Sequence, residues 1–224
     1  MRRAALASVY PTELRRGEKN DPFSLILDVG ATIEASAEDL VGFAIMGSAY
    51  AQIVSANRRP RVALLSNGTE AGKGPAAVVR AHEILAASDA LHFIGNIEGI
   101  DIPRGVADVV VTSGFVGNVV LKMLEGVSET VVRLARYAHK EKLTWRIGLM
   151  ALSSAIEQLK GVTDWQQYGG APLLGLSHLF IKAHGRSNPR AITNAIKLTS
   201  KALAGDLCGK IASGITAIDA SPRS

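Results

Sequence analysis

Residues 25–30 have the sequence LILDVG, a short apolar run that closes on an acidic residue and a glycine. An apolar run of this length, bounded by a turn residue, is typical of a buried strand. The residues that follow, 37–56, repeat apolar side chains at helical spacing, and Ser36 with Asp39 has the arrangement of a capping box. A buried strand followed by a helix is the repeating unit of an α/β protein.

The same unit recurs along the chain. Residues 61–65 (RVALL) predict a second strand, and a polar, glycine-spaced loop follows at residues 67–74. The next helix is predicted at residues 75–87, because Pro75 suits the first helical position. This alternation predicts a parallel sheet covered by helices. The further predicted elements are strands at 91–94 and 106–111, taken as neighbouring strands, strands at 169–175 and 179–183, a helical hairpin at 119–160, and a helix at 189–204.

The start of the chain does not show the repeating unit. Residues 1–24 contain no convincing strand followed by a helix, so we expect the first strand only at residue 25. We interpret residues 1–224 as a single α/β domain, with the helical hairpin of residues 119–160 as part of it.

Composition narrows the class of protein. The chain has 224 residues, of which 47% are apolar and 20% are charged, so it can bury a core and is not a disordered segment. Its net charge of +5 favours anionic partners such as phosphorylated substrates. Basic residues are not interleaved with aromatic ones, as they are in single-strand binders, so we expect no nucleic acid partner.

The cysteine content and the N-terminal sequence indicate the cellular compartment. Cys208 is the only cysteine, which excludes an internal disulfide and makes a reducing cytoplasm the expected location. Residues 1–10 lack the apolar core of a signal peptide, and the longest uncharged stretch, 165–181, contains glycines, Pro172 and His178. We therefore expect a soluble protein, or at most one that is peripheral to a membrane.

Open parallel sheets bind ligands at the carboxyl ends of their strands, so the loops after the strands are the candidate sites. The loop of residues 67–74 (NGTEAGKG) is not a Walker A motif, because its glycines are too close and Gly74 replaces the hydroxyl residue. Its glycines nevertheless allow backbone amides to approach an anion, and Lys73 adds a positive charge beside the next helix. The alternative is a tight turn with a solvated lysine. The candidate residues of this loop are Asn67, Glu70, Gly72, Lys73 and Gly74.

A second candidate follows the strand at residues 106–111. Gly114 and Gly117 come just before a predicted helix start at or near Asn118, which would leave several amides free to bind an anion. The alternative is that Asn118 is an N-cap and that the glycines pack the helix against the sheet. We include Ser113, Gly114, Gly117 and Asn118 as candidate binding residues, and Lys122 as either a ligand or a surface lysine.

A third candidate lies before the helix at residues 189–204. His184 is a possible proton carrier, Arg186 carries a guanidinium suited to phosphate, and Ser187 and Asn188 are either ligands or helix caps. The other histidines are scattered without metal-ligand spacing, so we predict no metal, and no motif calls for a cofactor.

Several segments together resemble the bacterial phosphate acyltransferases, in an order that covers the chain from about residue 4 to residue 205. They are LDVGA (27–31), FAIMGS (43–48), GKG (72–74), FIGNIEG (93–99), GFVGNVVLK (114–122), YGGAPLLG (168–175) and KAHG (182–185).

The resemblance implies a Rossmann-like three-layer α/β/α sandwich related to isocitrate dehydrogenases and phosphotransacetylases. It implies an enzyme of phospholipid synthesis that transfers a fatty acyl group from acyl carrier protein to inorganic phosphate, giving acyl phosphate. It also implies a cytoplasmic homodimer that associates peripherally with the membrane where the next acyltransferase resides. Family members carry an additional N-terminal segment with Gly-Gly-Asp, so this chain is similar to their C-terminal two-thirds.

Phosphate is ionised near neutral pH and can attack a thioester without a strong base, so the main requirements are position and charge. We expect residues 67–74 and 114–118 to hold phosphate, and Lys73 or His184 to steady the oxyanion or protonate the departing thiol. Two alternatives remain: a phosphotransacetylase-like enzyme that uses acyl-coenzyme A, and an inactive domain that only dimerises or binds carrier protein. The basic and apolar residues of 119–160 indicate contact with lipid, carrier protein or a second subunit.

Overall fold

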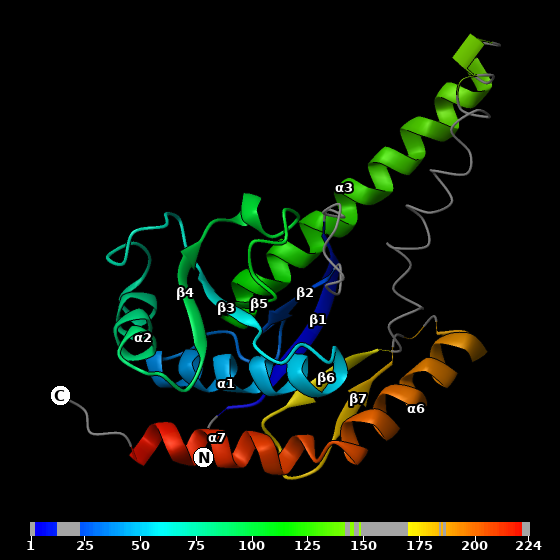
Figure 1. Ribbon diagram of the computed structural model, residues 1–224. Helices are drawn as coiled ribbons and strands as arrows, with labels where there is room; N and C mark the ends of the chain where they lie inside the picture. The colour runs from blue at the N-terminus through cyan, green and yellow to red at the C-terminus, as the bar shows by residue number, and fades with distance from the viewer. Residues whose placement is uncertain are drawn as a thin grey trace.

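The computed structural model describes residues 3–12, 23–141, 144–145, 148, 170–183, 185 and 187–220. Strands and helices alternate along most of this range (Figure 1). The strands are β1 (Ala5–Pro11), β2 (Phe23–Leu27), β3 (Arg61–Leu65), β4 (His92–Ile97), β5 (Val109–Val111), β6 (Ala171–Leu174) and β7 (Phe180–Lys182), and the helices are α1 (Ala37–Val54), α2 (Ala76–Ala86), α3 (Gly114–Glu141), α6 (Pro189–Ala204) and α7 (Leu207–Ala220), with a short 3-10 helix at Gly99–Asp101.

The seven strands form one mixed sheet in the order β4-β3-β5-β2-β1-β6-β7. The first four strands of that order are parallel, as predicted. The strands β1, β6 and β7 extend the sheet with antiparallel pairings. The carboxyl ends of β2, β3, β4 and β5 therefore share one edge of the sheet.

Two predictions about the strands are wrong. Residues 5–11 form a strand, β1, which lies between β2 and β6; its inward positions Ala5 and Ala7 are fully buried but too small to give a strong strand pattern. The strands predicted at 91–94 and 106–111 do not pair with each other. They correspond to β4 and β5, which lie on opposite sides of β3 and run parallel to it, because parallel neighbours need a crossover connection.

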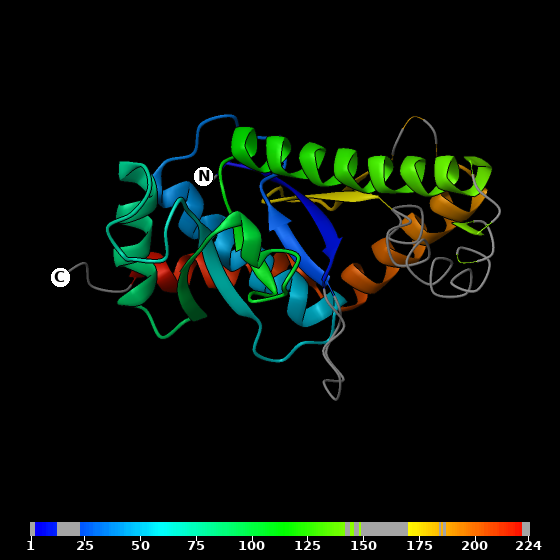
Figure 2. The same ribbon diagram turned by 90° about the horizontal axis from the view of Figure 1, so that it is seen from above.

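Three layers are visible when the sheet is viewed from the side and from above (Figures 1 and 2). Leu25 and Leu27 of β2 point into a core that includes α1, α2 and α7, whereas Ile26 points to the opposite face and into a core with the first turns of α3. This alternation along one strand follows from the period of two in a pleated sheet. The predicted three-layer α/β/α architecture is confirmed.

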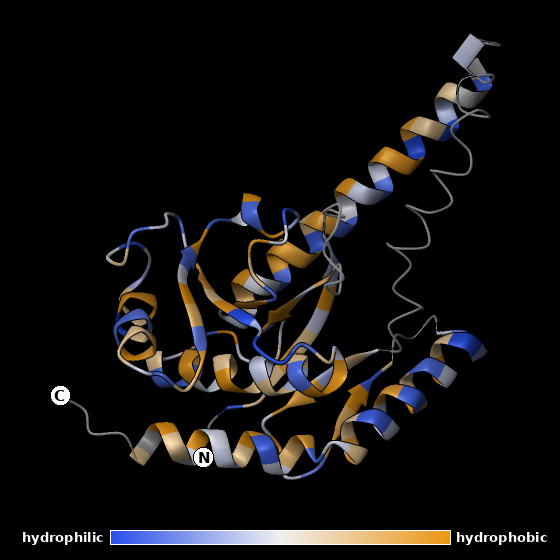
Figure 3. Ribbon diagram, viewed as in Figure 1, coloured by the Kyte–Doolittle hydropathy of each residue, from blue (hydrophilic) through white to orange (hydrophobic). Residues whose placement is uncertain are grey.

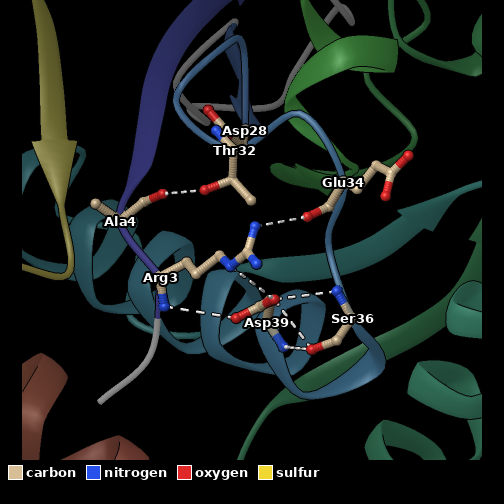
Figure 4. Close-up of polar contacts among 7 residues, drawn as sticks. All are labelled: Arg3, Ala4, Asp28, Thr32, Glu34, Ser36 and Asp39. Atoms are coloured by element: carbon tan, nitrogen blue, oxygen red, sulfur yellow. Dashed lines mark hydrogen bonds and ion pairs between the residues drawn. The ribbon is translucent and has the colours of Figure 1, made fainter.

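The capping box predicted at the start of α1 is also confirmed. Ser36 Oγ accepts a hydrogen bond from the Asp39 amide at 3.1 Å, and Asp39 Oδ2 accepts one from the Ser36 amide at 3.0 Å. Arg3 reaches the same corner, where its guanidinium donates to the Glu34 carbonyl oxygen at 3.2 Å and lies 3.8 Å from Asp39 Oδ2 (Figure 4). The segment before β1 is thus tied to the start of α1.

The helix α3 extends well beyond the sheet (Figure 1). Its 28 residues span about 42 Å at the rise of an α-helix, and Val120, Leu121 and Leu124 near its start pack against the sheet. Apolar and polar residues alternate along the remaining turns (Figure 3). The predicted second arm of the hairpin lies largely outside the described residues. Within the residues that the structure describes, no helix combines the length and apolar character needed to cross a membrane.

Candidate anion-binding site

Asp28 organises the loop that follows β2. Its side chain is fully buried, and its two carboxylate oxygens accept hydrogen bonds from the amides of Leu6 (2.8 Å), Gly30 (2.9 Å), Ala31 (3.0 Å) and Thr32 (2.6 Å). The Thr32 hydroxyl donates to the Ala4 carbonyl oxygen at 2.9 Å (Figure 4). A carboxylate bound by four amides is a structural element that fixes the loop, and it leaves little capacity to bind a ligand.

The start of α3 rests directly on this loop. The helix begins at Gly114, not near Asn118. The Gly114 amide donates to the Thr32 carbonyl oxygen at 2.8 Å, the Phe115 amide to that of Ile33 at 3.4 Å, and the Gly117 amide to that of Ser113 at 2.8 Å. Three of the amides expected to be free for an anion are therefore already bonded to the protein, so unpaired amides give this motif less support as an anion site than the sequence suggested.

Packing explains the two glycines of this motif. A Cβ atom added at Gly114 would lie 2.5 Å from Asp28 Oδ2 and from the Thr32 carbonyl oxygen, and one added at Gly117 would collide with the Asp28 carbonyl oxygen. Asn118 is not an N-cap but lies in the second turn, exposed, with its side chain beside Gly30. Ser113 is half-buried just before the helix, and Lys122 forms an ion pair with Glu125 at 2.7 Å.

The backbone amides of the loop of residues 67–74 are mostly not bonded to the described part of the protein, unlike several amides at the start of α3. The Lys73 amide donates to the Glu70 carbonyl oxygen at 3.0 Å. No other amide of residues 67–74 has a hydrogen-bond partner among the residues that the structure describes. Asn67, Glu70, Gly72 and Lys73 are exposed, and Pro75, the N-cap of α2, makes no side-chain cap. Among the described residues, this loop thus leaves more backbone amides without a protein partner than the start of α3 does.

Steric limits within this loop are uneven. Gly74 has φ +102°, and a Cβ there would lie 2.8 Å from Ser66 Oγ, so the position requires glycine. A Cβ at Gly68 would lie 2.8 Å from both Glu70 Oε2 and Lys73 Cγ, which places these two side chains over Gly68. Gly72 has open space around it. The carboxylate of Glu70 and the stem of Lys73 therefore share one side of the loop.

Asn96 of β4 holds the middle of this loop through a hydrogen bond. Its side chain is 5% exposed, its Nδ2 donates to the Glu70 carbonyl oxygen at 2.9 Å, and its Oδ1 lies 3.0 Å from His82 Nδ1. The sequence interpretation gave no role to Asn96, His82 or Asp28. The signal for Asp28 was an acidic residue directly after an apolar strand, and the signal for Asn96 was its place in the segment FIGNIEG.

The described residues of the third candidate segment follow a strand that ends at the other edge of the sheet. Since β6 runs in the direction of β2 and β7 runs against β6, the carboxyl end of β7 lies at the edge where the parallel strands begin. Asn188 caps α6 by accepting from the Ala191 amide at 2.9 Å, and Ser187 precedes it. The expectation that Ser187 and Asn188 follow a parallel strand is wrong, and His184 and Arg186 lie outside the described residues.

No group of three or more histidine, cysteine or acidic residues with metal-binding geometry occurs in the part of the chain that the structure describes. Burial, with a smaller contribution from Asp206, raises the pKa of the Cys208 thiol, which lowers the thiolate fraction near neutral pH and with it the reactivity of this cysteine.

The fold and the loops define an α/β protein whose candidate ligand site lies where parallel strands end. Comparison with known proteins then shows that the chain belongs to the family described as "Fatty acid synthesis protein", which matches residues 1–210. It is similar to proteins named phosphate acyltransferase, with 43% identity over 87% of the chain in Campylobacter jejuni strain RM1221, 43% over 93% in Lactococcus lactis subsp. cremoris, and 44% over 87% in Oceanobacillus iheyensis. The resemblance derived from the sequence is confirmed.

The length of the match differs between this chain and those relatives. The aligned region covers 56% of the Campylobacter protein, 62% of the Lactococcus protein and 57% of the Oceanobacillus protein. The chain therefore spans less than two-thirds of the length of the curated relatives it matches.

Proposed function

We propose that this chain binds inorganic phosphate in the loop of residues 67–74 as part of a phosphate acyltransferase of fatty acid and phospholipid synthesis. The observation that carries the proposal is a set of loop amides that have no partner among the described residues, beside the exposed Lys73 and the uncapped start of α2, in a chain of this family. Unpaired amides at a helix start, with a nearby cation, attract a phosphate dianion.

In the proposed reaction, a phosphate oxygen attacks the carbonyl carbon of a fatty acyl thioester carried by acyl carrier protein. A carbon–oxygen bond forms, the carbon–sulfur bond breaks, and the sulfur leaves with a proton as the free thiol. Lys73 holds the phosphate and steadies the developing negative charge. Ser113, which is half-buried, and Asn118, which is exposed, both follow β5 and remain predicted contacts of the phosphate.

A titration of the isotope-labelled chain with inorganic phosphate tests the first part of this proposal. The backbone amide resonances of Gly68, Gly72 and Gly74 are expected to shift together and to saturate. Resonances of Gly205, the C-cap of α6, and Gly209, in the first turn of α7, serve as the internal reference. Uniform small shifts throughout the chain would argue for nonspecific ion binding instead.

A comparison of acyl donors tests the second part. With phosphate in excess, acyl phosphate is expected to form faster from acyl-[acyl-carrier-protein] than from acyl-coenzyme A. The opposite order would favour the phosphotransacetylase-like alternative. Formation from neither donor, with phosphate still bound, would leave the chain as a phosphate-binding domain.

Lys73→Met is expected to weaken phosphate binding roughly ten- to hundredfold, because a hydrogen bond to a charged partner is lost while the apolar stem over Gly68 is kept. Isothermal titration with phosphate measures the change. The matched control is Lys197→Met, at an exposed lysine of α6, which is expected to bind phosphate as the wild-type chain does. Equal affinities for the two variants would remove Lys73 from the site.

We also propose that α3 meets a partner through its apolar stripe, with a second copy of the chain as the expected occupant in a homodimer. Val119, Met123, Val127, Val131 and Leu134 recur at helical spacing, and each is more than half exposed. Sedimentation equilibrium is expected to give twice the mass of the chain. A monomer that floats with anionic liposomes would instead favour the peripheral membrane contact.

A further inference from the structure

Asn96 points to the opposite face of the sheet from the one that regular strand alternation would give it. Phe93 packs in the core that contains α2, and Ile94 packs in the core that contains α3. Two residues beyond Ile94, Asn96 should also face α3. Instead, its side chain contacts His82 of α2.

A β-bulge causes this change of face. Between Val62 and Leu64 of β3 there is one intervening residue, whereas between their partners Phe93 and Asn96 of β4 there are two. Gly95 in this extra length has φ +95°, a conformation that residues with a side chain rarely adopt. Bulges re-aim side chains, and this one turns Asn96 toward α2 and the loop of residues 67–74.

The hydrogen bonds of Asn96 then fix its orientation. The Glu70 carbonyl oxygen can only accept, so the atom of Asn96 that faces it at 2.9 Å must be the amide nitrogen. The side-chain oxygen consequently faces His82 Nδ1 at 3.0 Å, and that nitrogen must carry the hydrogen. The His82 ring is itself held by an edge contact with Phe93, with ring centroids 5.1 Å apart.

We infer that Asn96, oriented by His82, is a positioning residue that sets the loop of residues 67–74 for phosphate. A buried amide costs free energy unless it is bonded, and an apolar residue would fill the same space without that cost. The Asn96 amide instead donates to one atom of the loop, the Glu70 carbonyl oxygen, which lies three residues before Lys73. This inference rests on the proposed function, because it assigns the geometry of that same loop.

Four variants of the whole chain test it by phosphate titration and by hydrogen exchange of the loop amides. Asn96→Asp keeps the oxygen that faces His82 but places a second oxygen against the Glu70 carbonyl. His82→Phe removes the donor and keeps the ring, whereas His82→Asn places an amide nitrogen where Nδ1 stands. The control is His92→Phe at the other end of β4, where the ring is 3.4 Å from the Arg59 carbonyl oxygen.

Asn96→Asp is expected to raise the dissociation constant for phosphate at least about tenfold and to speed exchange in residues 67–74. His82→Phe is expected to raise it about threefold, His82→Asn to restore it, and His92→Phe to leave it unchanged. If Asn96→Asp does not fold, the His82 series decides the matter. Unchanged affinity in His82→Phe, or in a folded Asn96→Asp with faster loop exchange, would overturn the inference alone. A wild-type chain that does not bind phosphate at these amides would overturn the proposed function, and this inference with it.

Discussion

Asp28→Ala is expected to lower the free energy of unfolding by at least about 3 kcal/mol, because it removes the only acceptor that the structure shows for the amides of Gly30, Ala31 and Thr32. These amides lie in a loop between β2 and α1, and the Leu6 amide of β1 loses the same partner. A loss of this size is a large fraction of the stability of an ordinary domain. Chemical denaturation followed by circular dichroism measures it.

Two further variants separate the effect of the carboxylate group from the effect of its buried position. Asp28→Asn retains one accepting oxygen and the shape of the side chain, so it should unfold at an intermediate denaturant concentration. Asp39→Ala removes an acidic residue that belongs to a capping box near the surface, and it should cost about 1 kcal/mol. If Asp28→Ala were no less stable than Asp39→Ala, the hydrogen bonds of the buried Asp28 carboxylate would not be what stabilises the loop after β2.

The parallel part of the fold was predictable because each strand carries its own apolar run. Residues 61–65 form β3 at the predicted bounds, and Ser36 with Asp39 caps α1 as expected. β1 was not predictable, since its buried positions are alanines and its place depends on pairing with β2 and β6. Pairing partners depend on the whole sheet, which local patterns do not encode.

The candidate site shows the same division between local and long-range information. The sequence correctly drew attention to the glycines of residues 67–74 and 114–118, but it could not say which glycines leave amides free and which only permit close packing. That difference depends on contacts with Thr32, Ile33 and Asp28, which lie far away along the chain. The role of Asn96 was not predicted for a related reason, because the bulge at Gly95 reverses the sheet face that strand alternation assigns to its side chain.

Gly117→Ala is expected to destabilise the chain by about 3 kcal/mol, at the upper end of the usual range for overpacking. The new methyl group would collide with the Asp28 carbonyl oxygen, and a backbone atom at the end of a buried strand cannot rotate away as a side chain can. The first turn of α3 would have to lift from the loop after β2. The Gly114 and Phe115 hydrogen bonds to that loop would then lengthen.

Gly126→Ala supplies a matched control on the same helix, since no atom lies within 4 Å of the position where its Cβ would stand. That variant should be more stable than the wild-type chain by about 1 kcal/mol, because alanine is the better helix former. Thermal unfolding of the two variants should therefore shift in opposite directions, although both introduce the same residue into α3. Equal shifts would mean that Gly117 serves helix flexibility or a ligand, and that close contact with Asp28 does not explain why glycine is needed where α3 meets the sheet.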